Sequence, residues 1–538
     1  MDKMTSRRAM LHRCLLFFFV AWVCAAPANA QEPFHPALNP QRFPVPDALI
    51  PNVQFWHDVF SRHASTQTVI HDDQYLDIVF SVVDVGDLVR QGASAATIER
   101  TGDRRARDEV RKYQQVLLRL AGARVAADET EVGRVRAMYA AKSRLPTDYR
   151  AAARRVRGQG GLKDRFQEAI QISGMFMEGI EQILVSHGVP TEVRCLPFVE
   201  SMFNYKARSR VGASGVWQFT ASTGRRYLQM NSAVDARLDV WLAADGAARM
   251  LADHYARVQS WPLALTGYNH GISGMVRAVR QVGTSDIGVV SQRYRSPSFG
   301  FASRNFYAEF VAAVTVFADR EQLFPGVEPM PARRFEEFAP GAFVSLLDLA
   351  NLTETPVSEL VEFNPALHQD VARGQLLVPP TYPLRVADGS RGAFERAFAQ
   401  LPGTRKRDRQ ITATYRIQRG DTLGAIARRL GTSVSALQRA NGIARANRIR
   451  AGQLIEVPGG SGQWTPLVWS PDTEAPGTRA SAQAGIHIVR TGETLTQIAA
   501  RYGLTVRALV AANEIPIPNR ILVGMQITIP ESAQSVVE

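Results

Sequence analysis

The chain has 538 residues, of which 45% are hydrophobic and 21% are charged, and its formal net charge is +13. This length exceeds the roughly 100–200 residues of an ordinary domain, so we expect several separately packed units. The composition is typical of a folded soluble protein and argues against a disordered or membrane-embedded one. The positive charge favours a partly acidic polymer as partner. Nucleic acid is not expected, because no helix-turn-helix, zinc-finger or RNA-binding signature accompanies the charge.

Residues 1–30 have the pattern of a secretory signal peptide. Arginines precede an apolar run, residues 15–26, and a small-x-small cleavage site follows at residues 28–30. The run is too short for a membrane-spanning helix, which needs roughly 20 residues. Trp22 and Val23 stand where a lipoprotein has small residues before Cys24, so lipid attachment is not expected. We expect secretion across the inner membrane to the periplasm, with a peripheral association with the outer membrane left open.

Without the predicted signal, Cys195 is the only remaining cysteine, so the chain can form no internal disulfide. Stability must then come from packed cores. The histidines lack HExxH or CxxC companions, and we expect no metal and no other cofactor.

Residues 31–178 are predicted to form a helical N-terminal region. Apolar positions between Val110 and Ala121 fall at helical spacing among charged residues, and no long alternating run appears before Pro190. We interpret this region as a helical wrap around the next domain, and we find no chemistry in it.

Glu200 is the strongest candidate for a catalytic residue. It ends an apolar helix, and a glycine-containing turn then leads to Trp217 and Gln218. Burial against Phe198, Phe203 and the tryptophan would disfavour the charged form of the carboxyl and make it a proton donor near neutral pH. A lone glutamate at a helix end is more often a surface residue, so the case for a catalytic role depends on the motifs around it.

Four motifs follow Glu200 in a specific order: Glu200-Ser201, Gly215-Val216-Trp217-Gln218-Phe219, Thr223-Gly224 and Tyr268-Asn269-His270-Gly271. In order and spacing they resemble the soluble lytic transglycosylase family. The resemblance implies an all-α, lysozyme-like domain over residues 179–320. It also implies cleavage of the β-1,4 bond between N-acetylmuramic acid and N-acetylglucosamine in peptidoglycan. Glu200 would protonate the leaving oxygen and then take a proton from the muramic 6-hydroxyl, so that a 1,6-anhydro ring forms without water.

The same resemblance implies substrate-binding roles for Ser209, Gln218, Tyr268 and Asn269. The alternative for Tyr268 is that it is a core aromatic residue whose hydroxyl forms a hydrogen bond within the protein. His270 is expected to be structural.

Such a mechanism needs one carboxylate, whereas most glycosidases use a pair. Asp235 and Asp239 are second-acid candidates by position only, so we expect a single-glutamate mechanism. The chain departs from the family at Thr220-Ala221, where Met-Pro is common, and at Ala302, where a glutamate is frequent. Glu309 lies near the second departure, but its spacing in the sequence is wrong.

An internal repeat occupies the C-terminal part, where equivalent residues are separated by 72 positions without a gap. Each copy is predicted as a small α+β unit in the order βααβ and resembles a LysM domain, which binds N-acetylglucosamine-containing glycans. We assign LysM domains to residues 413–458 and 486–531, with a linker at 459–485. A degenerate LysM-like unit is predicted at residues 336–383, followed by a second linker up to Ile411.

The resemblance places glycan contacts in the loop after the first strand and in the turn before the last strand. These residues are Gly420, Asp421, Thr422, Leu423, Asn447 and Ile449 in one unit, and Gly492, Glu493, Thr494, Leu495, Asn519 and Ile521 in the other. The alternative for the two leucines is a purely packing role, because small cores need every apolar residue.

The sequence thus predicts a multidomain enzyme that cuts the glycan strands of peptidoglycan. Two alternatives remain open, a non-catalytic peptidoglycan-binding scaffold and a goose-type lysozyme-like hydrolase. The sequence makes no prediction of the oligomeric state.

Overall fold

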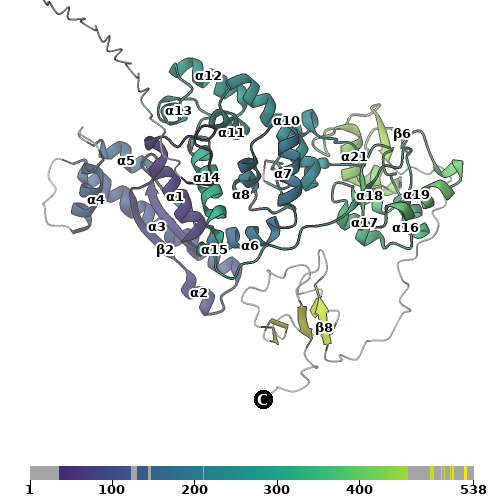
Figure 1. Ribbon diagram of the computed structural model, residues 1–538, viewed down its shortest axis with the longest axis horizontal. Coiled ribbons are helices and arrows are strands. Elements are labelled where there is room, and N and C mark those ends of the chain that lie inside the picture. The colour runs from purple at the N-terminus through teal and green to yellow at the C-terminus, as the bar shows by residue number, and fades with distance from the viewer. Residues whose placement is uncertain are drawn as a thin grey trace, which may run out of the picture.

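The computed structural model describes residues 35–122, 130–142, 147–209, 211–410, 412–430, 432–458 and 485–489, with short pieces between 498 and 529. The predicted signal peptide and residues 459–484 of the predicted linker lie outside the described residues. The described chain is mostly helical (Figure 1). None of its helices combines the length and the apolar character that crossing a membrane requires.

The N-terminal region combines helices with a three-stranded antiparallel sheet in the order β2-β1-β3. Its elements are α1 (Ile50–Ser61), β1 (Gln67–Asp72), β2 (Val79–Asp84), α2 (Gly86–Arg90), α3 (Ala95–Leu120), α4 (Thr130–Ala140), α5 (Tyr149–Arg155) and β3 (Val156–Gly160). The prediction of a wholly helical region is therefore wrong at the three strands. The central strand β1 is short, and its last four residues are all buried, so its sequence lacks the alternation that reveals a strand with one exposed face.

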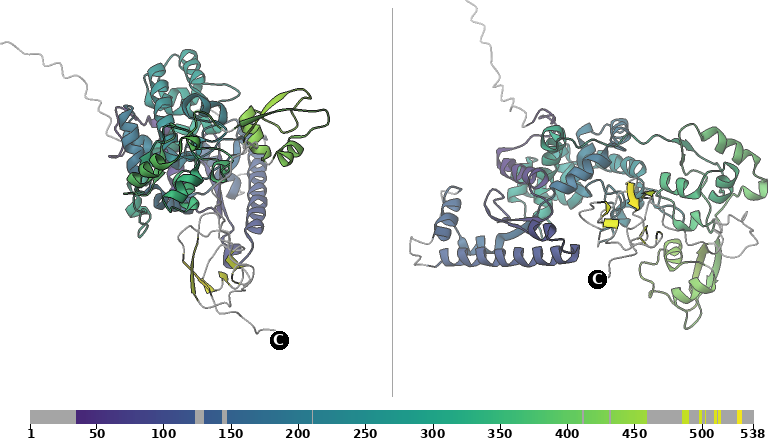
Figure 2. Two further views of the ribbon diagram at one scale, coloured as in Figure 1. Left: turned by 90° about the vertical axis from the view of Figure 1, so that its right-hand side faces the viewer. Right: turned by 90° about the horizontal axis from the view of Figure 1, so that it is seen from below.

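The long helix α3 lies against the sheet and encloses a core of its own with α4 and α5 (Figure 2). A buried carboxylate holds these parts together. Asp72 at the end of β1 accepts hydrogen bonds from the Tyr139 hydroxyl at 2.6 Å and from Arg155 at 2.9 Å. Its charge is therefore satisfied inside the fold.

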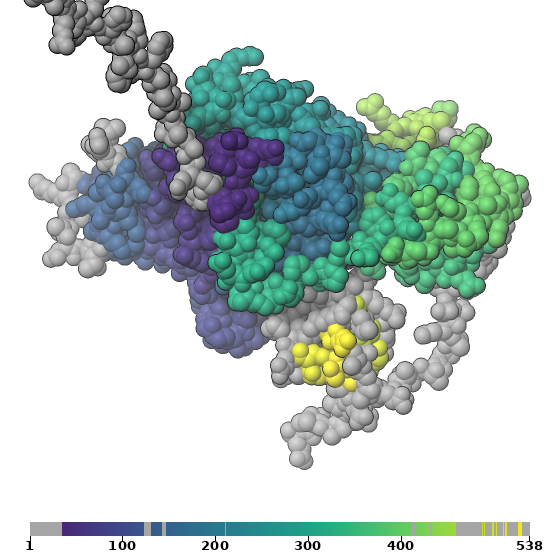
Figure 3. All heavy atoms as spheres, in the orientation of Figure 1, coloured from purple at the N-terminus to yellow at the C-terminus, as the bar shows by residue number. Residues whose placement is uncertain are grey.

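Residues 35–61 pack directly against the helical domain, as the purple and teal atoms of Figure 3 show. Phe43 and Phe310 lie 5.5 Å apart between ring centres, and the Tyr307 hydroxyl donates to the carbonyl of Pro44 at 2.8 Å. Asn52 on α1 donates to Asn305 at 2.7 Å. The N-terminal region and the helical domain therefore share one hydrophobic core.

The helical domain is built around α14, whose residues are buried on nearly every side. Its helices are α6 (Lys163–Ser173), α7 (Met177–Ser186), α8 (Leu196–Glu200), α9 (Ala221–Tyr227), α10 (Val240–Val258), α11 (Trp261–His270), α12 (Ile272–Val282), α13 (Ile287–Arg293), α14 (Phe301–Ala318) and α15 (Arg320–Leu323). Helices α1, α8 and α11 all contact α14. This packing brings the end of α8 and the end of α11 to the same central helix.

A smaller unit follows, and it is joined to the helical domain by a common core. Its elements are β4 (Glu336–Phe338), α16 (Leu346–Leu352), α17 (Val357–Phe363), α18 (Gln369–Ala372), β5 (Leu384–Val386) and α19 (Arg391–Gln400). Strand β5 pairs with β4, and Phe394 and Ala397 of α19 are buried. Part of the linker predicted before Ile411 is therefore a packed helix, and the unit extends past the predicted boundary at residue 383.

The interface between this unit and the helical domain contains a buried ion pair. The side chains of Arg385 and Asp239 are 2% and 0% exposed and contact each other directly. The aspartate also accepts from the backbone N–H groups of Trp241 and Leu242 and so caps α10. Both charges are removed from water, so each depends on the other as its partner. The ion pair therefore exists only while the two surfaces stay in contact.

The next unit runs β6 (Thr412–Arg416), α20 (Leu423–Arg429), α21 (Val434–Asn441) and β7 (Leu454–Pro458), with the two strands paired antiparallel. In the last unit the described strands β8 (Gly485–Ile488) and β9 (Gln526–Ile529) pair in the same way.

One asparagine makes the same contacts in all three small units. Asn364, Asn441 and Asn513 each donate to the carbonyl four residues earlier in the chain. Each also donates to a carbonyl of the last strand of its unit, which is β5, β7 or β9. Each also accepts from a backbone N–H of that strand, at 2.8, 2.7 and 2.6 Å. The unit at residues 336–401 therefore shares the internal anchor of the two C-terminal units.

Candidate active site

Glu200 is the last residue of α8, and aromatic packing fixes that helix. Phe198 stacks on Phe166 at 4.5 Å between ring centres and meets the edge of Phe203 at 4.7 Å. The glutamate keeps part of its surface exposed. Even so, the surrounding protein atoms raise its pKa from 4.5 to about 8, and burial is the cause. Glu200 is thus protonated at neutral pH, as a proton donor must be.

The loop after Glu200 holds an uncommon backbone conformation. Met202, Phe203 and Gln218 have positive φ angles of 51°, 53° and 47°. Such angles are costly for residues with a side chain and tend to gather at functional sites. Gly215 has φ +77°, and a Cβ there would overlap the carbonyl oxygen of Arg237, so glycine is required.

Hydrogen bonds attach this loop to the two neighbouring helices. The Ser201 hydroxyl donates to the carbonyl of Val216 at 2.8 Å, and the Tyr268 hydroxyl donates to the carbonyl of Trp217 at 2.7 Å. Trp217 is fully buried and donates through its Nε1 to Val240 at 3.2 Å. The Trp217 region is therefore fixed from both α8 and α11.

Tyr268 lies close enough to Glu200 for their charges to interact. Burial first, and then the charge of Glu200, raise the pKa of Tyr268 well above 10. The phenol thus remains a donor throughout the physiological range. Its hydroxyl is already used by the loop, so the packing role considered for Tyr268 is present in the structure together with its place beside the acid.

The other predicted site residues support the loop and α14. The Gln218 amide donates to the carbonyl of Gly215 at 2.8 Å. The Ser209 hydroxyl accepts from the backbone N–H of Ala213 at 2.9 Å and so closes its own turn. Asn269 accepts from the Ser303 hydroxyl at 2.7 Å. Within the described residues, no hydrogen bond joins any of these side chains to Glu200.

Neither aspartate considered as a second acid is available for proton transfer. Asp235 is bound to Arg237 at 2.8 Å, and this arginine also donates to the carbonyl of Gly212 at 2.9 Å, which holds the loop. Asp239 is bound to Arg385. Both carboxylates are structural.

The charge of Glu200 also reaches a second carboxyl, Glu309 on α14. Burial first, and then the charge of Glu200, raise its pKa to about 8, while Arg157 on β3 lowers it. Glu309 is seven residues after Ala302, which is close to two turns of helix, so both positions share one face of α14. This helical spacing is the signal by which the sequence could have indicated Glu309.

In the unit at residues 412–458, two of the predicted glycan-binding residues form hydrogen bonds within the unit. Asp421 accepts from the Tyr415 hydroxyl at 2.6 Å and from the N–H of Gln418 at 2.8 Å. Thr422 caps α20 through Ala425 at 3.1 Å.

The remaining predicted positions of this unit differ in exposure. Leu423 is 1% exposed in the core, so its packing role is confirmed, while Asn447 is exposed and Ile449 is half-buried. Gly420 has φ +90°, which suits the turn. Gly492, Glu493, Thr494, Leu495, Asn519 and Ile521 lie outside the described residues.

Comparison with known families gives this geometry a context. Residues 180–290 match the family model of the transglycosylase SLT domain. The chain therefore contains a transglycosylase SLT domain. Residues 415–458 and 487–530 match the LysM domain, so the chain also contains two LysM domains. The SLT match includes all five predicted site residues of the helical domain and ends before α14, which carries Glu309.

Curated relatives match parts of the chain. The chain is 25% identical over 348 residues to membrane-bound lytic murein transglycosylase D of Escherichia coli strain K12, and the match covers 63% of this chain and 73% of that protein. It is also 34% identical over 111 residues to the probable autolysin SsaALP of Staphylococcus aureus, covering 20% and 37% of the two chains. An endolysin of Bacillus phage PZA is 33% identical over 120 residues, covering 22% and 38%.

Proposed function

We propose that this protein is a peptidoglycan lytic transglycosylase in which Glu200 both donates and accepts the proton. The substrate bond is the β-1,4 linkage between N-acetylmuramic acid and N-acetylglucosamine. The observation that carries this assignment is a carboxyl at the end of α8 whose pKa is raised to about 8 by burial. A carboxyl in that state supplies a proton at neutral pH and is basic enough to take one back.

The reaction balances without water. The Glu200 carboxyl gives its proton to the glycosidic oxygen as the bond from that oxygen to the muramic C1 breaks. The resulting carboxylate then removes the proton of the muramic 6-hydroxyl while that oxygen bonds to C1. The products are a free 4-hydroxyl on N-acetylglucosamine and a 1,6-anhydromuramic end, and Glu200 is again protonated.

Glu309 favours this cycle by keeping Glu200 protonated between turnovers. Two neighbouring carboxyls cannot both ionise easily, because each negative charge disfavours the other. The interaction is visible in the pKa of Glu309, which the charge of Glu200 raises. Glu309 is a positioning residue here, since it acts through Glu200.

The LysM domains retain the enzyme on its polymer. Both would share the βααβ fold and bind N-acetylglucosamine through the loop at Gly420–Leu423 and the turn at Asn447–Ile449, or their equivalents in the second domain. Two weak binding modules on one chain raise the local enzyme concentration and can strengthen retention on the wall roughly 10²–10⁴-fold. We place the protein in the cell envelope, and more specifically in the periplasm after removal of residues 1–30.

The test is digestion of purified peptidoglycan followed by mass spectrometry of the soluble fragments. Wild-type protein is expected to release 1,6-anhydro fragments, and Glu200→Gln to release none. Glu328→Gln, which changes an exposed glutamate outside the helical domain's core, is the matched control.

Each alternative has its own signature in the same assay. Fragments heavier by one water, with reducing ends, would indicate a hydrolase instead. A protein that sediments with the wall but releases no fragments would be a binding scaffold.

A further inference from the structure

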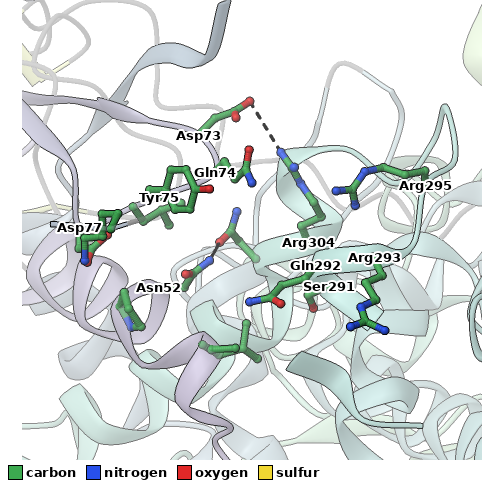
Figure 4. A pocket seen from close by; sticks show the side chains of 16 residues that line it. Asn52, Asp73, Gln74, Tyr75, Asp77, Ser291, Gln292, Arg293, Arg295 and Arg304 are labelled. Carbon is green, nitrogen blue, oxygen red and sulfur yellow. Dashed lines mark hydrogen bonds and ion pairs between the residues drawn. The ribbon is translucent and has the colours of Figure 1, made fainter. Parts of the chain in front are cut away.

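A charged cavity of about 420 Å³ lies where the N-terminal region meets the helical domain. Figure 4 shows Asp73, Gln74 and Tyr75 on one side of it and the arginines on the other. The walls come from α1, the turn between β1 and β2, α13 and α14. We call it the arginine cavity, after Arg293, Arg295 and Arg304.

The arginine cavity has a surplus of positive charge. Arg304 pairs with Asp73 at 3.7 Å, and Lys142 pairs with Asp77, so these four side chains largely cancel. Arg293 and Arg295 line the cavity with exposed side chains, and neither forms an ion pair with any residue in the described parts of the chain. Two guanidinium groups are thus left to face an incoming anion.

The existing ion pair in the cavity is incompletely satisfied. The Nε of Arg304 is buried and has no hydrogen-bond partner in the described structure. Burial raises the pKa of Asp73 despite the nearby arginine, so the carboxylate is poorly solvated where it stands. A buried donor without an acceptor is costly, and an anionic ligand in the cavity would supply one.

The cavity also offers groups that suit a peptide. Asn52, Gln74 and Gln292 line it, and carboxamides pair well with backbone N–H and C=O groups. Its volume falls within the roughly 300–1,000 Å³ of small-ligand sites. A short acidic peptide fits this combination of charge, amides and size.

Charge interactions connect the cavity to the catalytic carboxyl. Arg304 and Glu309 both lie on α14, five residues apart, which is roughly 7.5 Å along the helix axis. Arg157 interacts with Asp73, Arg304 and Glu309, and Glu309 in turn interacts with Glu200. Three extended residues of peptide span at most roughly 10 Å, which is comparable with the separation of Arg304 and Glu309 along α14.

We propose that the arginine cavity binds the carboxylate-bearing peptide stem of the peptidoglycan strand that is being cut. This inference rests on the proposed function for the identity of the strand. It gives the N-terminal region, which the sequence left without chemistry, a part in substrate recognition.

The first test measures binding without turnover. Full-length Glu200→Gln protein is titrated with a fluorescent stem tripeptide that has free carboxylates, and with the same peptide fully amidated. Adding Arg293→Gln and Arg295→Gln together is expected to weaken binding of the free-carboxylate peptide about tenfold. The control is Arg100→Gln with Arg280→Gln, which removes two exposed arginines from other surfaces. This control has the same net charge as the Arg293/Arg295 variant, and it is expected to bind the peptide as tightly as the Glu200→Gln protein does.

Three results would overturn the proposal. The two double variants could bind the peptide equally well, the amidated peptide could bind as tightly as the free one, or inorganic phosphate at equal concentration and ionic strength could displace the peptide completely. The last result would mean a general anion site.

The second test measures selectivity during turnover. The ratio of kcat/KM on peptide-bearing strands to that on strands stripped of peptide is expected to fall about tenfold in the Arg293/Arg295 variant. In the Arg100/Arg280 variant the ratio is expected to equal that of the wild type, and equal ratios in both variants would contradict the proposal. If wild-type protein releases no anhydro fragments at all, the proposed function fails, and the binding experiment still decides the question of the cavity.

Discussion

Replacing Glu309 by Gln is expected to move the alkaline limb of the activity profile to lower pH. Activity requires protonated Glu200, so kcat/KM falls as pH rises through its pKa of about 8. The charge of Glu200 raises the pKa of Glu309, and because such an interaction is reciprocal, an ionised Glu309 is expected to hold the proton on Glu200 to higher pH. Glutamine keeps the size and hydrogen-bonding capacity of the side chain but removes the charge.

The size of the shift follows from the interaction of the two carboxylates. For scale, Coulomb's law gives a repulsion of about 2 kcal/mol, or about 1.5 pH units, for any two like unit charges roughly 8 Å apart at an effective dielectric constant of about 20. The pKa values of Glu200 and Glu309 are both about 8. For two equivalent sites, half of the interaction appears in the midpoint of each, so the limb is expected to move down by about 0.7 pH unit.

The assay is the initial rate of soluble fragment release from peptidoglycan between pH 5 and 10, at substrate concentrations well below KM. Glu309→Asp retains a negative charge and is expected to restore most of the wild-type limb, while Glu328→Gln is expected to leave it unchanged. A limb in Glu309→Gln that coincides with the wild type, or lies at higher pH, would refute the argument that the two carboxyls interact.

Three further predictions concern stability. Because burial raises the pKa of Glu200, the stability that its protonated form contributes is complete below about pH 4.5 and is lost as pH rises through about 8. Urea unfolding of Glu200→Gln should therefore weaken less than that of the wild type between pH 5 and 9, and parallel pH dependences would contradict this. Asp239→Asn keeps the cap of α10 but leaves Arg385 buried without its main partner, so unfolding followed by tryptophan fluorescence should show a loss of about 3 kcal/mol; a loss below about 1 kcal/mol would be too small for a buried pair. Asn441→Ala removes three hydrogen bonds in its LysM domain and should cost about 2 kcal/mol, whereas Asn447→Ala at an exposed position should cost almost nothing.

The sequence predicted the parts of the site that are contiguous in the chain. Glu200, the loop to Gln218 and Tyr268 carry recognisable motifs, and the structure brings Tyr268 and Glu200 together. Glu309 could not be assigned a role in the same way, because its place beside Glu200 depends on how α14 packs against α8. The helical spacing from Ala302 indicates Glu309 as a candidate, but only the packing of α14 determines which side chains its face meets.

Two errors in the fold have related causes. Strand β1 was missed because it is covered on both faces, so apolar and polar residues do not alternate along it. The linker prediction is wrong at α19, where Phe394 and Ala397 provide one buried face. In both segments the tertiary environment, and not the local pattern, determines the structure.

The three small units share the contacts of one asparagine, but they differ in the turn that follows the first strand. The asparagine at positions 364, 441 and 513 joins the carbonyl four residues before it to the closing strand, and an alanine there would leave these backbone groups without their side-chain partner. The turn glycine of the first unit is replaced by Phe343, whose backbone instead pairs with Arg407, while the core of that unit includes residues of the helical domain. In the unit at residues 336–401 the asparagine anchor therefore stands without the turn glycine, and packing against the helical domain completes its core.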